Sequence, residues 1–499
     1  MLPLGVHAET PLSAIDWLAE HSLKGSPKLS STPNLRENPA LSATVSTDIE
    51  VTVLRDIQRD AVGLLPPEVT GLPVTLWRNS TTQDLLSLLE ASQVSQNPSI
   101  QSLTMRVMLA EGDAPYDSNG KFNFLRAKLE KLIQYGAIDP ALAMLERAAP
   151  LPAPLVPILF DLSMYSEALE PACEQVLQLG AAFENDSARI YCLARRGEWQ
   201  SANIMLTTAE ALQSLTPRET AMLHFFLETG SEKISDLYFS ADSVPTPLEY
   251  RLYEAFGEPV PANNLPLAFS VAELSGDKGW KAQLEAAERL SKSGVFSDNQ
   301  LLGLLTKKPA PASGGIWDRV TMIQDLEQAL EANAPARISV ALRTVWSAMG
   351  TSALATPIAR LFYKRLVAAN LLKQDLVLVH EMGLLTDHYQ DAAKALITRS
   401  RKHRLEVAVA LNRFTFFSPR NEFEQAILKA YKTPRIPYSV SNLLAQGKLG
   451  EVILNATLQF EKGSDGDLQD LIEALSTLRH IGLDDTARRA TLSLIKLGY

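Results

Sequence analysis

Two histidines lie close to the sequence pattern of a zinc-dependent protease. In such enzymes a helix carries His-Glu and a second histidine four positions after the first, so that both imidazoles face one metal ion. His380 and Glu381 begin this pattern, but the required position holds Leu384, and the next histidine is His388. This spacing favours polar residues near a turn. We therefore predict no metal site here, and no cofactor elsewhere.

A run of acidic residues resembles part of a calcium-binding loop. Asp465, Asp467 and Asp470 could supply oxygen ligands, but Ser476 stands where such a loop places its closing glutamate. Carboxylates are also favoured at the N-terminus of a helix, where the helix dipole is positive. We therefore predict an acidic helix start rather than a calcium site.

One basic cluster stands out against a mixed charge pattern. Its members are Arg399, Arg401, Lys402, His403 and Arg404. We interpret it as the solvated end of a helix, and the alternative is a surface for an anionic partner. The 499-residue chain carries 57 acidic and 47 basic residues, a net charge of −10. This balance argues against a nucleic-acid partner, because phosphate binding needs a concentrated basic face.

The common catalytic and ligand-binding motifs are absent from the sequence. It contains no glycine-rich phosphate loop, no GxGxxG and no GxSxG. No apolar run approaches the roughly 20 residues that a membrane span requires, so we predict no span. Hydrophobic residues make up 46% of the chain and charged residues 21%, which is typical of a globular protein.

The strongest structural signal is a pair of short helices in the stretch 187–212, joined at Gly197. The second helix places Ala202, Met205, Leu206 and Ala209 on one face, with the spacing of an amphipathic helix. Neither helix can bury its apolar stripe alone, so each must pack on the other and on a neighbouring pair. This packing is that of a helical-repeat solenoid.

The same spacing recurs around four glycines that we take as turns between helices: Gly136, Gly197, Gly447 and Gly482. A leucine lies four positions before each glycine, and a small residue lies five positions after it. These residues are Leu132, Leu193, Leu443 and Leu478, followed by Ala141, Ala202, Val452 and Ala487. Such a pattern is what a tight antiparallel helix pair requires.

At these positions the chain resembles tetratricopeptide-like repeat proteins, most closely in the segment LARRGEWQSA. The resemblance implies stacked helical hairpins and a concave surface that binds a partner. The family's small residue early in the first helix is replaced by Leu129, Ile190, Val440 and Leu475, and no strict period links the pairs. We therefore predict an all-α fold, a degenerate TPR-like α-solenoid of helical hairpins.

Helix starts are marked by capping residues. Thr81 with Asp84, and Thr216 before Pro217 with Glu219, have the sequence of a capping box. Two further helices are predicted to start at cap-proline pairs, Asp139-Pro140 and Ser418-Pro419. The Pro-rich stretch 243–266 is expected to interrupt the helix pairs.

The N-terminal segments have a different character. Residues 1–8 end in Val6-His7-Ala8, which fits the last residues of an export signal. Residues 9–22 predict a short amphipathic helix, either a docking peptide for a partner or a cap on the chain's own body. Residues 23–47 predict a flexible linker. Residues 48–80 predict an extended segment packed on the body, strand-like at Ile49, Val51 and Val53, with its prolines and Gly71 breaking any helix.

The N-terminal half also resembles a group of exported bacterial proteins, through SAIDWL and VGLLPPEVTGLP to the helical repeats. Some members are labelled antifreeze glycopeptide polyprotein, but this sequence has no Ala-Ala-Thr array, so the resemblance implies export and a helical body without an activity. We predict a periplasmic or otherwise exported protein, and the alternative is a cytoplasmic one.

The helical body divides at 307–315, KKPAPASGG, into halves spanning 81–306 and 316–499. The last helix is predicted over 484–497, with Arg488 and Arg489 on its exposed face, as in a capping repeat. Cys173 and Cys192 fall on successive predicted helices. A disulfide can join them, but we favour two small buried thiols.

These observations favour a non-enzymatic scaffold or adaptor of the cell envelope. Its partner would be a protein or peptide held on the concave helical surface. Aromatic residues dominate binding energy at interfaces, and the candidate partner-binding residues are Ile15, Trp17, Leu18, Tyr191, Trp199, Trp346 and Tyr389. The alternative is a cell-envelope enzyme or enzyme regulator, for example of peptidoglycan metabolism, with a helical superstructure.

Overall fold

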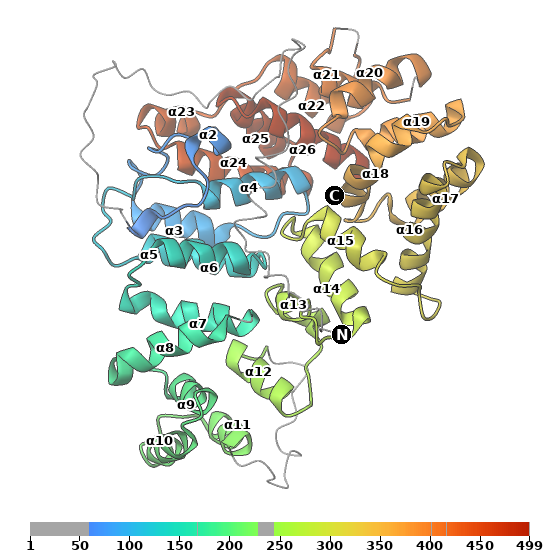
Figure 1. The fold of residues 1–499 in the computed structure, drawn as a ribbon. Helices are drawn as coiled ribbons and strands as arrows, with labels where there is room; N and C mark the ends of the chain where they lie inside the picture. The colour runs from blue at the N-terminus through green and yellow to red at the C-terminus, as the bar shows by residue number, and fades with distance from the viewer. Residues whose placement is uncertain (1–58, 167, 228–243, 401, 416, 499) are drawn as a thin grey trace, which may run out of the picture.

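The computed structural model describes residues 59–166, 168–227, 244–400, 402–415 and 417–498 (Figure 1). Within these ranges the chain forms 25 α-helices and no β-strand. The predicted all-α class is confirmed for this part of the chain. None of its helices combines the length and the apolar character that a membrane span requires.

The helices are short, and all except α2 and α13 span 8 to 16 residues. Those of the first half are α2 (Pro67–Thr70), α3 (Thr82–Ala91), α4 (Pro98–Leu109), α5 (Asn123–Gln134), α6 (Ile138–Arg147), α7 (Val156–Tyr165), α8 (Leu169–Leu179), α9 (Asp186–Arg195), α10 (Trp199–Ala211), α11 (Pro217–Leu227), α12 (Pro247–Ala255), α13 (Phe269–Ala272), α14 (Trp280–Lys292) and α15 (Asp298–Leu305). Those of the second half are α16 (Ile316–Glu331), α17 (Pro335–Met349), α18 (Ala355–Ala368), α19 (Lys373–Gly383), α20 (Tyr389–Arg399), α21 (Arg404–Leu411), α22 (Glu422–Lys432), α23 (Tyr438–Ala445), α24 (Leu449–Ser464), α25 (Leu468–His480) and α26 (Asp484–Leu497).

The four predicted glycine turns are present and share one geometry. Gly136, Gly197, Gly447 and Gly482 each join two helices and have φ between +71° and +89°. In each turn, the residue after the glycine donates its N–H to the carbonyl of the leucine that lies four positions before the glycine, at 2.8 to 3.0 Å. This is the Schellman hydrogen bond, which satisfies a carbonyl at the helix end.

The predicted caps are partly correct. Thr81 accepts from Asp84 N–H at 3.0 Å, and Thr216 and Glu219 form the reciprocal bonds of a capping box. The prediction at Asp139-Pro140 is wrong, because the turn at Gly136 already starts α6 at Ile138. The prediction at Ser418-Pro419 is also wrong.

At that second site α22 starts at Glu422, after a cap by Asn421, whose side chain accepts from Glu424 N–H. The Pro-rich stretch 243–266 contains α12, which a capping box of Thr246 and Glu249 starts. The cap residue locates both starts: Asn421 caps α22, which begins three residues after Pro419, whereas Thr246 caps α12 with Pro247 at its first position.

Several N-terminal predictions lie outside the described residues. They are the export-signal remnant 1–8, the helix 9–22 with Ile15, Trp17 and Leu18, the linker 23–47, and the strand-like residues Ile49, Val51 and Val53.

The described part of the predicted extended segment begins at Arg59. Leu72 and Trp77 are buried in the core. Pro67 does not break helix structure here. It occupies the first turn of α2, where a missing N–H costs nothing, and Gly71 ends that helix with φ +69°.

The C-terminal helices pack against the N-terminal ones, and Figure 1 shows α24 and α26 beside α3 and α4. We call this packing the closure. Asn97 donates to the carbonyl of Ala490 at 2.9 Å, and Gly450 N–H donates to the carbonyl of Leu76 at 3.1 Å. Trp77 lies directly against Gly450, where a Cβ would come within 2.4 Å of the indole ring.

The closure corrects the prediction for α26. Its bounds are those expected, but it does not present a solvated capping face. Arg488 is mostly buried, pairs with Asp484 and donates to the carbonyl of Ala410. Arg489 is half-buried and pairs with Asp387 at 2.7 Å. The reason is long-range, because both arginines face distant parts of the chain, Arg488 toward Ala410 of α21 and Arg489 toward Asp387 before α20.

The predicted boundary at 307–315 follows α15 and is bridged on both sides. The rings of Trp280 and Trp317 lie 5.0 Å apart, and Arg319 pairs with Glu288 at 2.7 Å. Gln324 donates to the carbonyl of Lys308 at 2.8 Å. Helices on either side of the segment are therefore held together by side chains.

Candidate functional site

The helices α8 to α11 (Leu169–Leu227) form an arm that Figure 1 shows at the lower end of the molecule. Cys173 of α8 and Cys192 of α9 are joined by a disulfide, with Cα atoms 5.1 Å apart. Our favoured prediction of two buried thiols is therefore wrong, and the alternative, a disulfide, is present. Because α8 and α9 pack side by side, the two buried sulfur atoms fall within bonding distance.

An aromatic cluster lies next to the disulfide on this arm. The ring of Tyr191, on α9, stacks on Phe226 of α11 with centroids 5.3 Å apart. Trp199, at the start of α10, lies 6.3 Å from the same phenylalanine ring. The structure thus brings two of the predicted binding residues together through Phe226, which the sequence analysis did not single out.

The two candidates differ in exposure. Tyr191 is buried, with 6% of its surface accessible, and burial raises the pKa of its phenol. Trp199 is 47% exposed although it is a large aromatic residue. Tyr191 therefore holds the cluster in place, and Trp199 is the member that another molecule could contact.

The outer surface of α10 continues from Trp199 and is apolar for a solvent-facing helix. Ile204 is 69% exposed, and Leu212, just after the helix, is 73% exposed. The hydroxyls of Thr207 and Thr208 donate to carbonyls of their own helix, at 3.0 and 2.8 Å, so they are partly satisfied internally. We call this surface the α10 face: Trp199, Asn203, Ile204, Thr207, Thr208 and Leu212.

The α10 face lacks the charges that normally solvate an exposed helix. The helix carries one charged side chain, Glu210, which lies 3.2 Å from His224 of α11. Exposed single apolar residues are ordinary, but a group of them on one helix face without charged side chains is typical of interaction surfaces. A periodicity search could not find this face, because Ile204 and Trp199 fall outside the buried stripe.

The other described candidates lie elsewhere and have structural contacts. Trp346, on α17, is half-buried and packs over Gly350 at the end of its helix. Tyr389, on α20, is buried, and its hydroxyl donates to Asp485 at 2.7 Å. Figure 1 shows α17 and α20 well away from the arm, so these residues do not join the α10 face.

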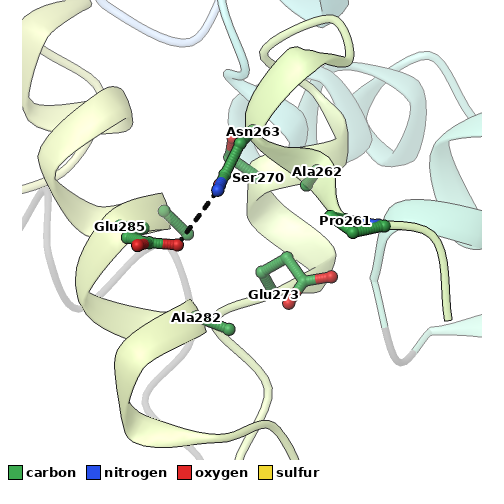
Figure 2. Close-up of a pocket in the computed structure, with 8 residues that line it drawn as sticks. Pro261, Ala262, Asn263, Ser270, Glu273, Ala282 and Glu285 are labelled. Carbon is green, nitrogen blue, oxygen red and sulfur yellow. Dashed lines mark hydrogen bonds between the residues drawn. The ribbon is translucent and has the colours of Figure 1, made fainter. Parts of the chain in front are cut away.

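A small pocket lies between α13, α14 and the loop before them (Figure 2). The carboxylates of Glu273 and Glu285 line it, together with Asn263, which donates to Glu285 at 3.1 Å. Glu273 accepts a hydrogen bond from the hydroxyl of Tyr250, and burial with this bond raises the pKa of the tyrosine. The cavity measures about 60 Å³, which suits a few waters or a small cation.

The histidines noted in the sequence have structural partners. His380 is buried beside Tyr363, whose hydroxyl is 3.5 Å from Nδ1, and His388 stacks on the ring of the same tyrosine with centroids 5.9 Å apart. Burial lowers the pKa of His380. In the part of the chain that the structure describes, no three His, Cys, Asp or Glu side chains are arranged to hold a metal ion.

The prediction for the acidic run is confirmed, and the prediction for the basic cluster is only partly correct. Asp467 caps α25 by accepting from the N–H groups of Gln469 and Asp470, so the predicted acidic helix start is present. The basic cluster is not uniformly solvated. His403 is buried and contacts Glu381 at 2.7 Å through Nε2 and Glu406 at 3.1 Å through Nδ1. Its position before α21 turns it inward, toward α19.

Comparison with known proteins gives no significant match to a protein-family model, a curated protein or a solved structure. The function of the chain is therefore inferred from its own residues.

Proposed function

We propose that this protein is an exported scaffold that binds a protein or peptide partner through the surface of a TPR-like helical array. The α10 face carries the proposal. It combines an exposed tryptophan, an exposed isoleucine and an uncharged helix surface at the outer end of the arm. Tryptophan anchors are enriched among the residues that dominate binding energy.

The chemistry of the α10 face defines the partner. An uncharged surface with apolar side chains favours a segment that offers aliphatic or aromatic side chains, such as one face of an amphipathic helix. Charged partner segments would lose hydration without gaining an ion pair. Binding should therefore depend weakly on salt, unlike an electrostatically steered interaction.

The disulfide supports the exported location. Disulfides persist in the periplasm and outside the cell, whereas thiols in most cytosolic proteins stay reduced. The Cys173–Cys192 bridge joins α8 to α9, the helix that carries Tyr191 of the aromatic cluster and packs against α10. An oxidising compartment would thus keep the binding arm in its folded arrangement.

The proposal is tested by affinity capture from the cell-envelope fraction of the native host, at low and at high salt. Wild-type protein is compared with the double variant Trp199→Ser/Ile204→Ser. The matched control is Tyr438→Ser, because Tyr438 is an exposed aromatic residue on α23, with 86% of its surface accessible. We expect a stoichiometric partner with wild type and Tyr438→Ser at both salt concentrations, and none with the double variant. Equal recovery by all three proteins would refute the proposed surface.

A further inference from the structure

Residues 399–435, which include α21 and α22, carry a local excess of positive charge in an acidic protein. This stretch contains nine arginines and lysines and three glutamates, whereas the whole chain has a net charge of −10. Glu406 is buried, so it does not balance the surface, and Glu422 and Glu424 lie in the first turn of α22. From residue 425 to residue 435 the chain therefore contributes only positive charges.

The ends of α21 and α22 lie side by side. Arg479, on α25, donates to the carbonyl of Tyr431 at 2.8 Å and to the side chain of Asn412 at 3.3 Å. One guanidinium thus spans the last turn of α22 and the residue after α21. Arg413 and Lys432 directly follow Asn412 and Tyr431, and both are exposed. The fold therefore brings cations from the ends of two different helices together.

The periodicity of α22 directs its lysines to solvent. The buried residues of this helix are Ala426, Ile427, Ala430 and Tyr431. Lys429 and Lys432 are exposed on the opposite face, three positions apart, so they are neighbours on the helix surface. Arg435 follows the helix and is exposed as well.

The start of α21 adds two more cations to the same outer layer. Lys402 and Arg404 are exposed, and the guanidinium of Arg404 lies 6.0 Å from the centre of the Phe417 ring. Phe417 packs on Phe414 at 5.8 Å, and Phe414 packs on the α22 residue Tyr431 at 5.3 Å. These aromatic contacts tie the start of α21 to the end of α22. We call this surface the basic face: Lys402, Arg404, Arg413, Lys429, Lys432 and Arg435.

Helix stability explains only part of the basic face. The lysines in the last turn of α22 complement the negative end of its dipole. Arg404, however, is the first residue of α21 and Lys402 precedes it, at the positive end of a helix, where a cation is unfavourable. Among the described residues, no carboxylate forms an ion pair with Lys402, Lys429 or Lys432. Their charges are therefore available to another molecule.

The spacing of the basic face favours an anionic surface over a single anion, because its cations are spread along two helices. A bilayer of anionic phospholipids presents many phosphates in one plane. Each lysine or arginine close to such a surface strengthens binding about fivefold. A long polyanion such as DNA would also meet the acidic remainder of the chain, whereas a planar bilayer contacts one side of the molecule only.

We propose that the basic face binds the surface of an anionic phospholipid bilayer, so that the protein associates with a membrane without spanning it. Figure 1 shows α21 and α22 at the upper end of the molecule and the arm at the lower end. A protein bound in this way directs the α10 face away from the membrane. The interaction is electrostatic, so it weakens with salt, unlike the partner binding proposed for the α10 face.

The test is co-sedimentation of the purified protein with lipid vesicles at low and at high salt. Vesicles of phosphatidylcholine alone are compared with vesicles that contain equal parts of phosphatidylcholine and phosphatidylglycerol. We expect wild type to bind the phosphatidylglycerol vesicles at low salt, to dissociate from them at high salt, and not to bind phosphatidylcholine. The triple variant Lys429→Glu/Lys432→Glu/Arg435→Glu should bind at least about 100-fold more weakly.

The matched control is Lys121→Glu/Lys364→Glu/Lys373→Glu, which makes the same change of charge at exposed lysines outside the basic face. It should retain most of the binding. Both variants keep the α10 face, so partner capture through that face distinguishes a failure of this proposal from a failure of the proposed function. Equal binding of wild type to both kinds of vesicle, or to neither, would overturn the proposal. So would unchanged binding by the first variant, or tighter binding of wild type to duplex DNA than to the vesicles at equal phosphate concentration.

Discussion

Lys128 illustrates, at the scale of one residue, how the helical body treats a charge. The lysine lies on α5 with none of its surface accessible, and its Nζ donates to the carbonyl of Val62 at 2.8 Å. Burial lowers its pKa to about 7, although the nearby Asp60 acts in the opposite direction. Lysines on a helix are usually solvated, so the sequence pattern could not single this one out.

We expect Lys128 to make the free energy of unfolding rise with pH between about 7 and 10.5. In this interval the unfolded chain, with its ordinary lysine pKa, binds a proton that the folded protein does not bind. Stability increases with pH wherever the unfolded state binds more protons. One such group contributes at most about 1.4 kcal/mol per pH unit.

Urea denaturation of wild type and Lys128→Met at several pH values measures this contribution. The unfolding free energy of wild type should rise relative to that of Lys128→Met as the pH increases from about 7 to 10.5. Parallel pH profiles for the two proteins would show that the buried lysine has no such effect.

At the scale of elements, the turns between helices share one hydrogen bond whether or not they contain glycine. Asn333, between α16 and α17, has φ +44°, and Ala334 N–H donates to the carbonyl of Ala329 at 3.1 Å. Gln213, after α10, has φ +54°, and the next residue bonds in the same way. The sequence pattern found four of these turns and missed those at Asn333 and Gln213, and also the glycine turns at Gly257 and Gly294, which have the same bond.

The two turns that flank α10 give a paired prediction. Gly197→Ala should lower the free energy of unfolding by about 1 kcal/mol, because alanine disfavours left-handed backbone. No atom lies within 4 Å of the added Cβ, so strain alone sets this cost. Gln213→Gly should raise stability by about 0.5–1 kcal/mol for the converse reason. Chemical denaturation measures both, and effects of the same sign would contradict the argument.

Local features of the elements could be predicted from sequence, and contacts between distant elements could not. The glycine turns, the Thr81 and Thr216 caps and the bounds of α26 depend on residues within one or two turns of helix. The Cys173–Cys192 bridge depends on how α8 and α9 meet, which two isolated cysteines do not specify. Trp199 was identified as a candidate, but Ile204 and Phe226 were not, since they carry no motif of their own.

At the scale of the whole molecule, the closure is the feature that no local sequence pattern predicts. Asn97 and Ala490 are 393 positions apart in sequence, yet they share a hydrogen bond. A solenoid in which each repeat contacts only its neighbours would leave α4 and α26 apart. Here the packing of α24 and α26 on α3 and α4 joins the predicted N-terminal and C-terminal halves.

Alanine substitutions at two helical glycines distinguish the effect of packing in the closure from the effect of helix propensity. Gly450→Ala should destabilise the protein by about 1–3 kcal/mol, because the new Cβ would overlap the Trp77 ring. Gly303→Ala, in α15, should stabilise it by about 0.5–1 kcal/mol, because nothing lies near that position. Hydrogen exchange of Gly450→Ala should accelerate in α3 as well as in α24. Faster exchange confined to α24 would indicate that the closure is not a cooperative contact.

The measurement that tests the central claim most directly is site-specific photo-crosslinking in the native host. A photoreactive amino acid is placed at Ile204 on the α10 face or, as the control, at Tyr438 on α23. The account predicts one discrete, higher-mass adduct in the cell envelope from position 204 and none from position 438. No adduct from position 204, or the same adducts from both positions, would contradict the claim that the α10 face binds a partner.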